Sequence, residues 1–353
     1  MSKPLKIFGS LLTEIVNTGL CMYCGSCIAS CPVNVISYTD DERPALVGRC
    51  VLCELCYYGC PRVELPLAYV ERSTFGRNRT ANEPLGVKRG IFSARCTDKK
   101  TLSKSQDGGV VTALLQHALE TGLVGHAILI GRDSRAPWRP RPTIAGTGDE
   151  ILLNAGSKYT ATGSLGALAE ATAGYPQSDL AFVGMPCQIQ ALRRIATSPH
   201  GARKLAESVK LAIGLFCYNT YKYSPLFVSY IKEKHKLDLE RISRIEIKSG
   251  HFKAYCGAEA KLDVPVGNLE SYVHPGCSKC QDFTAELADI SIGHAGSKVG
   301  WCTVITRNQD ANDLIQSAAK AGTIQLNPAD VELSSVIKLS ESKKRREAPY
   351  IRS

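Results

Sequence analysis

Eight of the fifteen cysteines lie within the first sixty residues and form two runs with the same spacing. Each run reads C-x-x-C-x-x-C-x-x-x-C and is followed by a proline, Pro32 or Pro61. Bacterial ferredoxins that hold two 4Fe–4S clusters use this spacing, and the fourth cysteine of each run binds the other cluster. The predicted ligands of one cluster are Cys21, Cys24, Cys27 and Cys60, and those of the other are Cys50, Cys53, Cys56 and Cys31.

The alternative for these runs is a pair of zinc knuckles, because zinc also binds C-x-x-C pairs. Two complete four-cysteine runs, each closed by a proline, favour iron–sulfur clusters instead. Such clusters accept and release electrons one at a time. We therefore expect the chain to carry single electrons.

Four further cysteines form a second constellation in the later part of the chain. Cys187 and Cys217 each follow an apolar segment that is typical of a strand, and Cys277 and Cys280 form a C-x-x-C pair. The ends of strands are where α/β folds gather their ligands. These residues predict a third 4Fe–4S cluster or a zinc site, with buried free thiols as the alternative for the two single cysteines. The other cysteines are expected to be packing residues: Cys96, Cys256 and Cys302.

Two segments rich in small and polar residues could hold a polar cofactor. In segment 106–109 (QDGG), two glycines allow close approach of the backbone, and the helix start that follows favours a phosphate. A flavin pyrophosphate could bind there, although a plain turn is the favoured interpretation of these four residues alone. Segment 154–160 (NAGSKYT) also precedes a helical pattern. A lysine beside a flavin ring could stabilise negative charge on the reduced ring, and an exposed surface lysine is an equal alternative for Lys158.

Apolar patterning indicates which elements must position these residues. Residues 1–70 are expected to form a two-cluster ferredoxin domain, 71–90 a polar linker, 91–325 an α/β domain and 326–353 a basic C-terminal tail. Apolar runs and helical periodicity alternate through the third of these regions, which predicts the α/β class. The expected strands are 127–130, 180–183, 209–216, 241–248, 288–292 and 303–305. The expected helices are 110–119, 165–173, 188–196, 225–234 and 311–321.

The composition of the chain argues against a membrane-spanning, exported or nucleic-acid-binding protein. No apolar run of the 353 residues approaches the roughly 20 residues of a membrane span, and no signal peptide is recognisable. Fifteen cysteines in such a chain argue for metal ligation in a reducing cytoplasm. The formal charge of +10 falls to about +4 once three clusters are bound. This suits an anionic cofactor or an acidic protein partner rather than nucleic acid. The basic run at 343–346 is expected to be a solvated tail, with docking on a partner or a membrane surface as the alternative.

Several short motifs together resemble the family formed by the beta subunits of coenzyme F420 hydrogenases and dehydrogenases. They span residues 93–307 and keep the order of that family, with the ferredoxin pattern placed before them. This arrangement looks most like the F420-oxidising input subunit of archaeal respiratory dehydrogenases. The motifs are SAR at 93–95, QDGGVVT at 106–112, SKYT at 157–160, MPCQ at 185–188, FCYN at 216–219, CSKC at 277–280, AELADIS at 285–291 and GWCTVITR at 300–307.

The resemblance implies an FAD, a coenzyme F420 site against it, and one 4Fe–4S cluster beside the flavin. The third group of cysteines falls on the cysteine motifs of the family. Two departures from the family pattern are cysteines at 96 and 302 in place of hydroxyl residues, and a basic loop at 294–299 in place of one with a Pro-Asp pair. The candidate cofactor residues are Gln106, Asp107, Gly108, Gly109, Thr112, Ser157, Lys158, Tyr159 and Thr160.

The resulting expectation is an oxidoreductase subunit of a larger redox complex. Reduced F420 would give a hydride to FAD, and single electrons would leave through three 4Fe–4S clusters to a protein partner, or flow in reverse. The complex would be cytoplasmic, either free or docked at the inner face of the membrane. The alternatives are a reductase of a chlorophyll-type pigment, a subunit that only passes electrons between proteins, and a zinc-bound interaction module.

Overall fold

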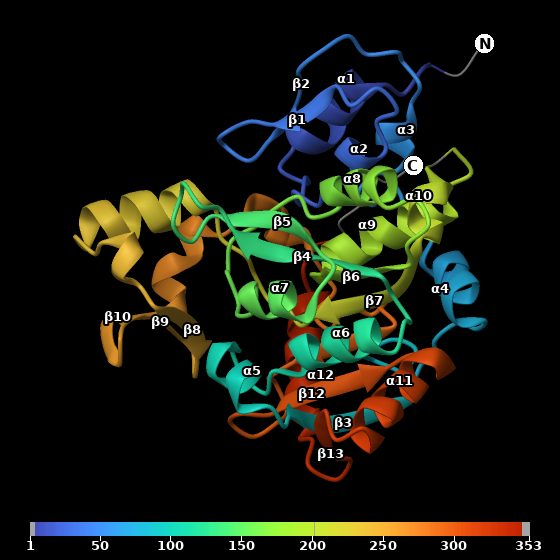
Figure 1. Cartoon of the computed structure of the whole chain (residues 1–353). Coiled ribbons are helices and arrows are strands. Elements are labelled where there is room, and N and C mark those ends of the chain that lie inside the picture. The colour runs from blue at the N-terminus through green and yellow to red at the C-terminus, as the bar shows by residue number, and fades with distance from the viewer. Residues whose placement is uncertain (1–3, 201, 348–353) are drawn as a thin grey trace.

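The structure is a computed structural model that describes residues 4–200 and 202–347. The N-terminal cysteine-rich region forms a small module at one end of the molecule (Figure 1). Its core joins the short helices and the hairpin to the cysteines, through apolar side chains such as Phe8, Ile15 and Ile36. The elements are α1 (Phe8–Leu11), a π-helical turn (Leu12–Val16), α2 (Ser26–Ala29), antiparallel strands β1 (Ile36–Tyr38) and β2 (Pro44–Leu46), and α3 (Leu55–Tyr58).

An eight-stranded mixed sheet forms the centre of the remaining chain, in the order β13-β3-β12-β11-β7-β6-β4-β5. Strands β4, β6, β7 and β11 run parallel, and the outer strands are antiparallel to their neighbours. The parallel strands are short apolar runs because both of their faces are covered. The strands are β3 (Gly90–Cys96), β4 (His126–Arg132), β5 (Pro140–Ala145), β6 (Leu180–Gly184), β7 (Val209–Leu215), β11 (Ile290–Gly293), β12 (Cys302–Thr306) and β13 (Ile324–Asn327).

Helices cover both faces of this sheet, which confirms the predicted α/β class (Figure 1). One face packs against α6 (Val110–Glu120), α7 (Gly148–Leu153) and α11 (Gln309–Lys320). The other face packs against α8 (Gly166–Gly174), α9 (Pro186–Thr197) and α10 (Arg203–Glu207). The second of these layers also receives Ala29 of α2, so the cysteine-rich module lies on this side.

A three-stranded antiparallel sheet forms a separate lobe with its own core. It contains β8 (Arg244–Lys248), β9 (His251–Cys256) and β10 (Glu259–Pro265). The π-helix Ser224–Lys234 and the 3-10 helix Val266–Tyr272 complete its core. Figure 1 shows this lobe beside helix α5 (Lys99–Lys104).

Most predicted elements of the large domain are present. The apolar strands near 128, 182, 212, 290 and 304 are β4, β6, β7, β11 and β12, and four expected helices are α6, α8, α9 and α11. Two expectations need correction in detail. The helix expected at 225–234 is a π-helix, and the strand expected at 241–248 begins only at Arg244, after a 3-10 turn. The edge strands β5 and β13 and the inner strand β3 were not predicted.

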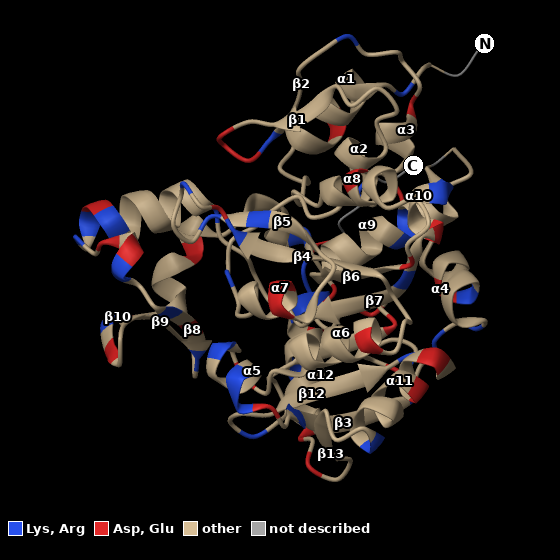
Figure 2. Ribbon diagram, in the orientation of Figure 1, with Lys and Arg blue, Asp and Glu red and all other residues tan. Residues whose placement is uncertain are grey.

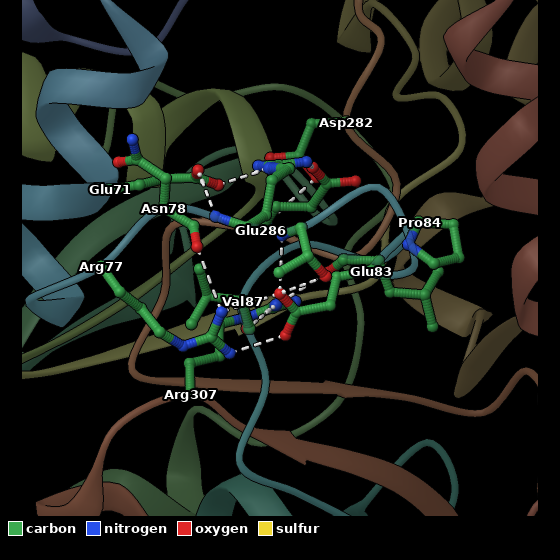
Figure 3. Close-up of polar contacts among 12 residues, drawn as sticks. Glu71, Arg77, Asn78, Glu83, Pro84, Val87, Asp282, Glu286 and Arg307 are labelled. Carbon is green, nitrogen blue, oxygen red and sulfur yellow. Dashed lines mark hydrogen bonds and ion pairs between the residues drawn. The ribbon is translucent and has the colours of Figure 1, made fainter.

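The expectation of a polar linker at 71–90 is wrong. Helix α4 (Leu67–Phe75) extends into this segment and packs against α9. The charged side chains that suggested an exposed connection are paired instead: Glu71 and Glu83 are buried, and Arg79 bridges Glu71 to Glu286. Figure 3 shows the polar contacts of this network and labels Glu71, Glu83 and Glu286.

The expectation of a solvated basic tail is also wrong within the described residues. Helix α12 (Leu333–Lys344) occupies most of this region, and the side chain of Lys343 is 1% exposed. Elsewhere Lys and Arg are spread over several elements, including α5 and α10, as Figure 2 shows. No helix in residues 4–200 and 202–347 is both long and apolar enough to cross a membrane.

Candidate functional site

The first group of cysteines surrounds helix α2. Burial and the neighbouring Cys60 raise the pKa of Cys21 to about 11, and burial with Cys21, Cys24 and Cys60 raises the pKa of Cys27 well above its usual value. Cys60 comes from the second run, so the structure gathers the crossed set that the spacing predicts. The hydroxyl of Ser26 donates to the carbonyl of Gly59 at 2.5 Å and ties the two runs together.

The second group of cysteines lines a cavity at the outer end of the module. Cys31, Cys50, Cys53 and Cys56 share this cavity with apolar side chains including Phe8. Burial, followed by Cys53 and Cys50, raises the pKa of Cys56 to about 12. Cys53 is exposed, unlike Cys31 and Cys56.

The third group of cysteines converges from three separate elements. Cys187 lies in the first turn of α9 and Cys217 follows β7. Cys277 lies within the 3-10 turn Pro275–Lys279, and Cys280 directly follows it. Burial and the nearby Cys280 and Cys217 raise the pKa of Cys187 well above its ordinary value. Burial also raises the pKa of Cys217 to about 12. The structure therefore brings together all four cysteines that the sequence singled out.

The third group lies directly against the first. Cys24 is among the thiols that raise the pKa of Cys187, after burial, Cys280 and Cys217. A β-carbon added to Gly276 would lie 2.2 Å from the carbonyl oxygen of Cys21, so the two ligand loops touch. The buried Arg62 donates to the carbonyl of Gly276 at 3.3 Å. The groups thus form a series in which the third contacts the first, and the second lies furthest out.

The double glycine before α6 has a reason within the fold itself. A β-carbon on Gly108 would lie 2.9 Å from the carbonyl oxygen of Ala94 and 3.1 Å from the sulfur of Cys302. Gly109 has φ +68°, a left-handed conformation that glycine adopts without strain. Both glycines therefore allow segment 106–109 to lie tightly over the ends of β3 and β12.

Polar groups gather around Asp107 at the same end of the sheet. Burial raises the pKa of this carboxyl group, while the nearby His294 and Lys248 oppose the shift. Gln106 is half-buried and Thr112 is buried on α6. The basic loop at 294–299 and strand β8 thus both face the candidate cofactor segment.

Lys158 is buried, so the alternative of an exposed surface lysine is wrong. Its ammonium group donates to the carbonyls of Asn154, Gly156 and Ala155, at 2.7 Å for Gly156 and 3.4 Å for Ala155. Burial and, to a smaller extent, Arg132 lower its pKa to about 7. The lysine therefore stabilises its own loop from within.

The loop that follows Lys158 is bonded to the chain just after Cys217. The amide of Tyr221 donates to the carbonyl of Tyr159 at 3.0 Å, and the amide of Ala161 donates to the carbonyl of Tyr221 at 3.1 Å. Ser157 is half-buried at the start of this loop. The hydroxyl of Thr160 is buried and has no hydrogen-bond partner in the described part of the chain. An orphaned hydroxyl of this kind fits a loop that binds a polar cofactor.

Two residues beside the third group of cysteines were not predicted because they belong to the expected tail. Lys343 donates to the carbonyls of Cys217 and Asp282 at 2.6 and 2.7 Å, and Arg346 donates to the carbonyl of Cys277 at 2.6 Å. The sequence does place Val336, Ser340 and Lys343 at helical spacing, and the structure buries all three. The four consecutive basic residues obscured this spacing.

Comparisons with known proteins agree with the order of the motifs. Residues 91–169 and 177–332 match the N-terminal and C-terminal parts of the coenzyme F420 hydrogenase/dehydrogenase beta subunit. The chain belongs to this family of beta subunits. Residues 14–37 match the 4Fe–4S binding domain, so the family domain is preceded by an iron–sulfur domain, as predicted.

Relatives within this family cover the chain to different extents. The coenzyme F420 hydrogenase subunit beta of Methanothermobacter thermautotrophicus is 36% identical over 74% of this chain and 93% of that protein. An F(420)H(2) dehydrogenase subunit of Methanosarcina mazei is 27% identical over 96% of this chain and 93% of that protein. The second alignment includes the cysteine-rich N-terminal module.

A solved structure shows the same fold. A chain of the F420-reducing NiFe hydrogenase complex from Methanosarcina barkeri superposes with a TM-score of 0.71 and 33% sequence identity. The superposition covers 76% of this chain and 92% of that chain. That chain is part of a multi-subunit redox complex, and members of this family are oxidoreductase subunits.

Proposed function

We propose that this subunit exchanges a hydride with coenzyme F420 through a bound FAD and passes single electrons through three 4Fe–4S clusters to a protein partner. The observation that carries the proposal is the series of three four-cysteine groups, which begins beside the candidate flavin loop. The names of the relatives support F420 as the substrate. The partner would belong to a larger redox complex, as for the subunits that the chain resembles.

The proposal requires a flavin because the substrate and the clusters exchange electrons in different numbers. Coenzyme F420 exchanges hydride, whereas iron–sulfur clusters exchange one electron at a time, and a bound flavin supplies the conversion between them. The residues that would hold it are the loop 157–160, with the unpaired hydroxyl of Thr160, and the segment 106–109 with Thr112. The hydrogen bonds between Tyr159 and Tyr221 fix this loop against the chain that follows the cluster ligand Cys217.

The order of the cysteine groups supports a path for electrons along the molecule. The third group lies between the candidate flavin loop and the first group, and the second group lies at the outer end of the module. Cys53 of the second group is exposed, as are its neighbours Val51 and Leu52. This exposed apolar surface next to a ligand is where a partner could approach the last cluster.

The experiment is an anaerobic reconstitution of the full chain with iron, sulfide and FAD. We expect about twelve iron atoms and one flavin per chain, and rapid bleaching of the flavin by reduced F420. Cys277→Ser should lose one cluster and leave two, whereas Cys256→Ser, outside the three groups, should keep all three. Flavin that reduced F420 does not bleach would refute the proposed substrate and would favour electron transfer between proteins alone.

A further inference from the structure

Helix α12 and the residues just after it carry two cations, Lys343 and Arg346, that reach the third group of cysteines. Lys343 approaches from inside the protein and reaches the carbonyls of Cys217 and Asp282. Arg346 approaches from the half-exposed side and reaches the carbonyl of Cys277. Hydrogen bonds to these carbonyls hold both charges beside the ligand loops.

Lys343 has no carboxylate of its own to balance it. Among the described residues it forms no ion pair, although its side chain is 1% exposed. Burial opposes the shift, yet Cys280, Cys217 and Cys277, followed by Asp282, raise the pKa of Lys343 above its usual value. A buried charge without an ion pair is costly, so the main counter-charge is to be sought among these cysteines.

The acidic side chains nearby form no ion pair with Lys343 among the described residues. Glu286 is paired with Arg79 and with Lys344, the latter at 2.8 Å. The carboxylate of Asp282 accepts the backbone amide of Glu286 at 3.1 Å and the side-chain amide of Gln190 at 3.3 Å. Figure 3 shows Asp282 and Glu286 side by side in this network, together with Arg307. The charge of Lys343 is therefore shared between Asp282 and the cysteine group, whose members act on it more strongly.

We propose that α12 supplies the counter-charge of the third cluster and that Lys343 raises the reduction potential of this cluster. The inference rests on the proposed function, because it requires a cluster on Cys187, Cys217, Cys277 and Cys280. An oxidised cube with four thiolates carries about two negative charges, and reduction adds a third. A fixed cation in a low-dielectric site stabilises the more negative state more strongly.

This role of Lys343 would influence the first single-electron transfer, from the flavin to the third cluster. The third cluster lies nearest to the candidate flavin loop, so its potential determines how readily it takes an electron from that side. The family match ends at residue 332, and α12 begins at Leu333. The counter-charge therefore comes from a part of the chain that lies outside the matched family region.

The alternative is that Lys343 only anchors α12 through its two hydrogen bonds. Lys343→Gln separates the two roles, because glutamine keeps N–H donors but removes the charge. Lys343→Arg keeps the charge. Lys338→Gln is the matched control, since Lys338 is exposed on the same helix.

The test is a redox titration of the reconstituted full chain, followed by paramagnetic resonance. In K343Q we expect one of the three clusters to become harder to reduce by about tenfold, equivalent to about 59 mV for a one-electron couple. K343R should restore the midpoint, and K338Q should leave all three unchanged. Arg346→Gln should shift the same cluster in the same direction by less, because Arg346 is half-exposed.

An unchanged midpoint in K343Q, or the same shift in K343Q and K343R, would overturn the proposal. If K343Q lost the signal of the third cluster, R346Q would decide, and an unchanged midpoint there would also overturn it. Failure of the proposed function is recognised separately. A wild-type chain that binds only about eight iron atoms lacks the third cluster before any variant is made.

Discussion

Gly276 is the closest point between the ligand loops of the third and first groups, so we predict that Gly276→Ala separates them. The added β-carbon would lie 2.2 Å from the carbonyl oxygen of Cys21 and 2.9 Å from its carbonyl carbon. Ordinary contact begins at 3.4 Å, so one loop must retreat by roughly 1.2 Å. Both of these atoms belong to backbone, which cannot rotate away as a side chain can. Overpacking of this kind costs about 1–3 kcal/mol of folding free energy.

The matched control is Gly267→Ala, in the preceding 3-10 helix, where nothing lies within 4 Å of the added β-carbon. Chemical denaturation should show the loss of stability in G276A and little change in G267A. Rapid-freeze paramagnetic resonance after mixing with reduced F420 should show slower reduction of the two N-terminal clusters in G276A, with unchanged bleaching of the flavin. G276A that matched G267A in both stability and electron transfer would refute the contact between the two groups.

Three further variants test other parts of the account. Thr160→Val should weaken flavin binding several-fold, because a hydrogen bond is worth about 1 kcal/mol, and equilibrium dialysis that finds unchanged affinity would contradict a cofactor contact. Cys53→Ser should remove the outermost cluster, leave flavin bleaching intact and abolish turnover with the native acceptor; full turnover would place the exit elsewhere. Glu286→Gln should destabilise the chain by about 1–3 kcal/mol, because Arg79 keeps its pair with Glu71 but loses one charged partner. A denaturation midpoint equal to that of the wild type would refute this network.

Local sequence patterns were sufficient where the chemistry depends on spacing. The two cysteine runs could be recognised without tertiary information, since most of the predicted ligands of each cluster lie within one short segment. The buried parallel strands β6 and β7 were recognisable because a strand covered on both faces is an apolar run. The third cysteine group could be suspected because Cys187 and Cys217 follow such strands.

The remaining features depend on contacts between distant parts of the chain. Arg79 and Glu286 are 207 positions apart, so nothing local reveals that ion pairs bury Glu71 and Glu83 within the polar segment 71–90. Likewise, Lys343 donates hydrogen bonds to Cys217 and Asp282, which lie 126 and 61 positions away in the sequence. Strand β3 and the edge strand β13 lack the strong apolar run of the central strands. Charged residues predict exposure to solvent. In both segments, however, contacts with distant parts of the chain bury some of the charged side chains.

The most direct measurement of the central claim is the number of electrons that the reconstituted chain takes from reduced F420. A flavin accepts two electrons and each 4Fe–4S cluster accepts one, so a flavin in contact with three clusters holds five. Because each F420 delivers a hydride, an anaerobic optical titration should reach its endpoint at about 2.5 equivalents per chain, with flavin and cluster absorbance both bleached. An endpoint at about one equivalent, with the cluster absorbance unchanged, would show that the cysteine groups do not receive electrons from the flavin and would contradict the account.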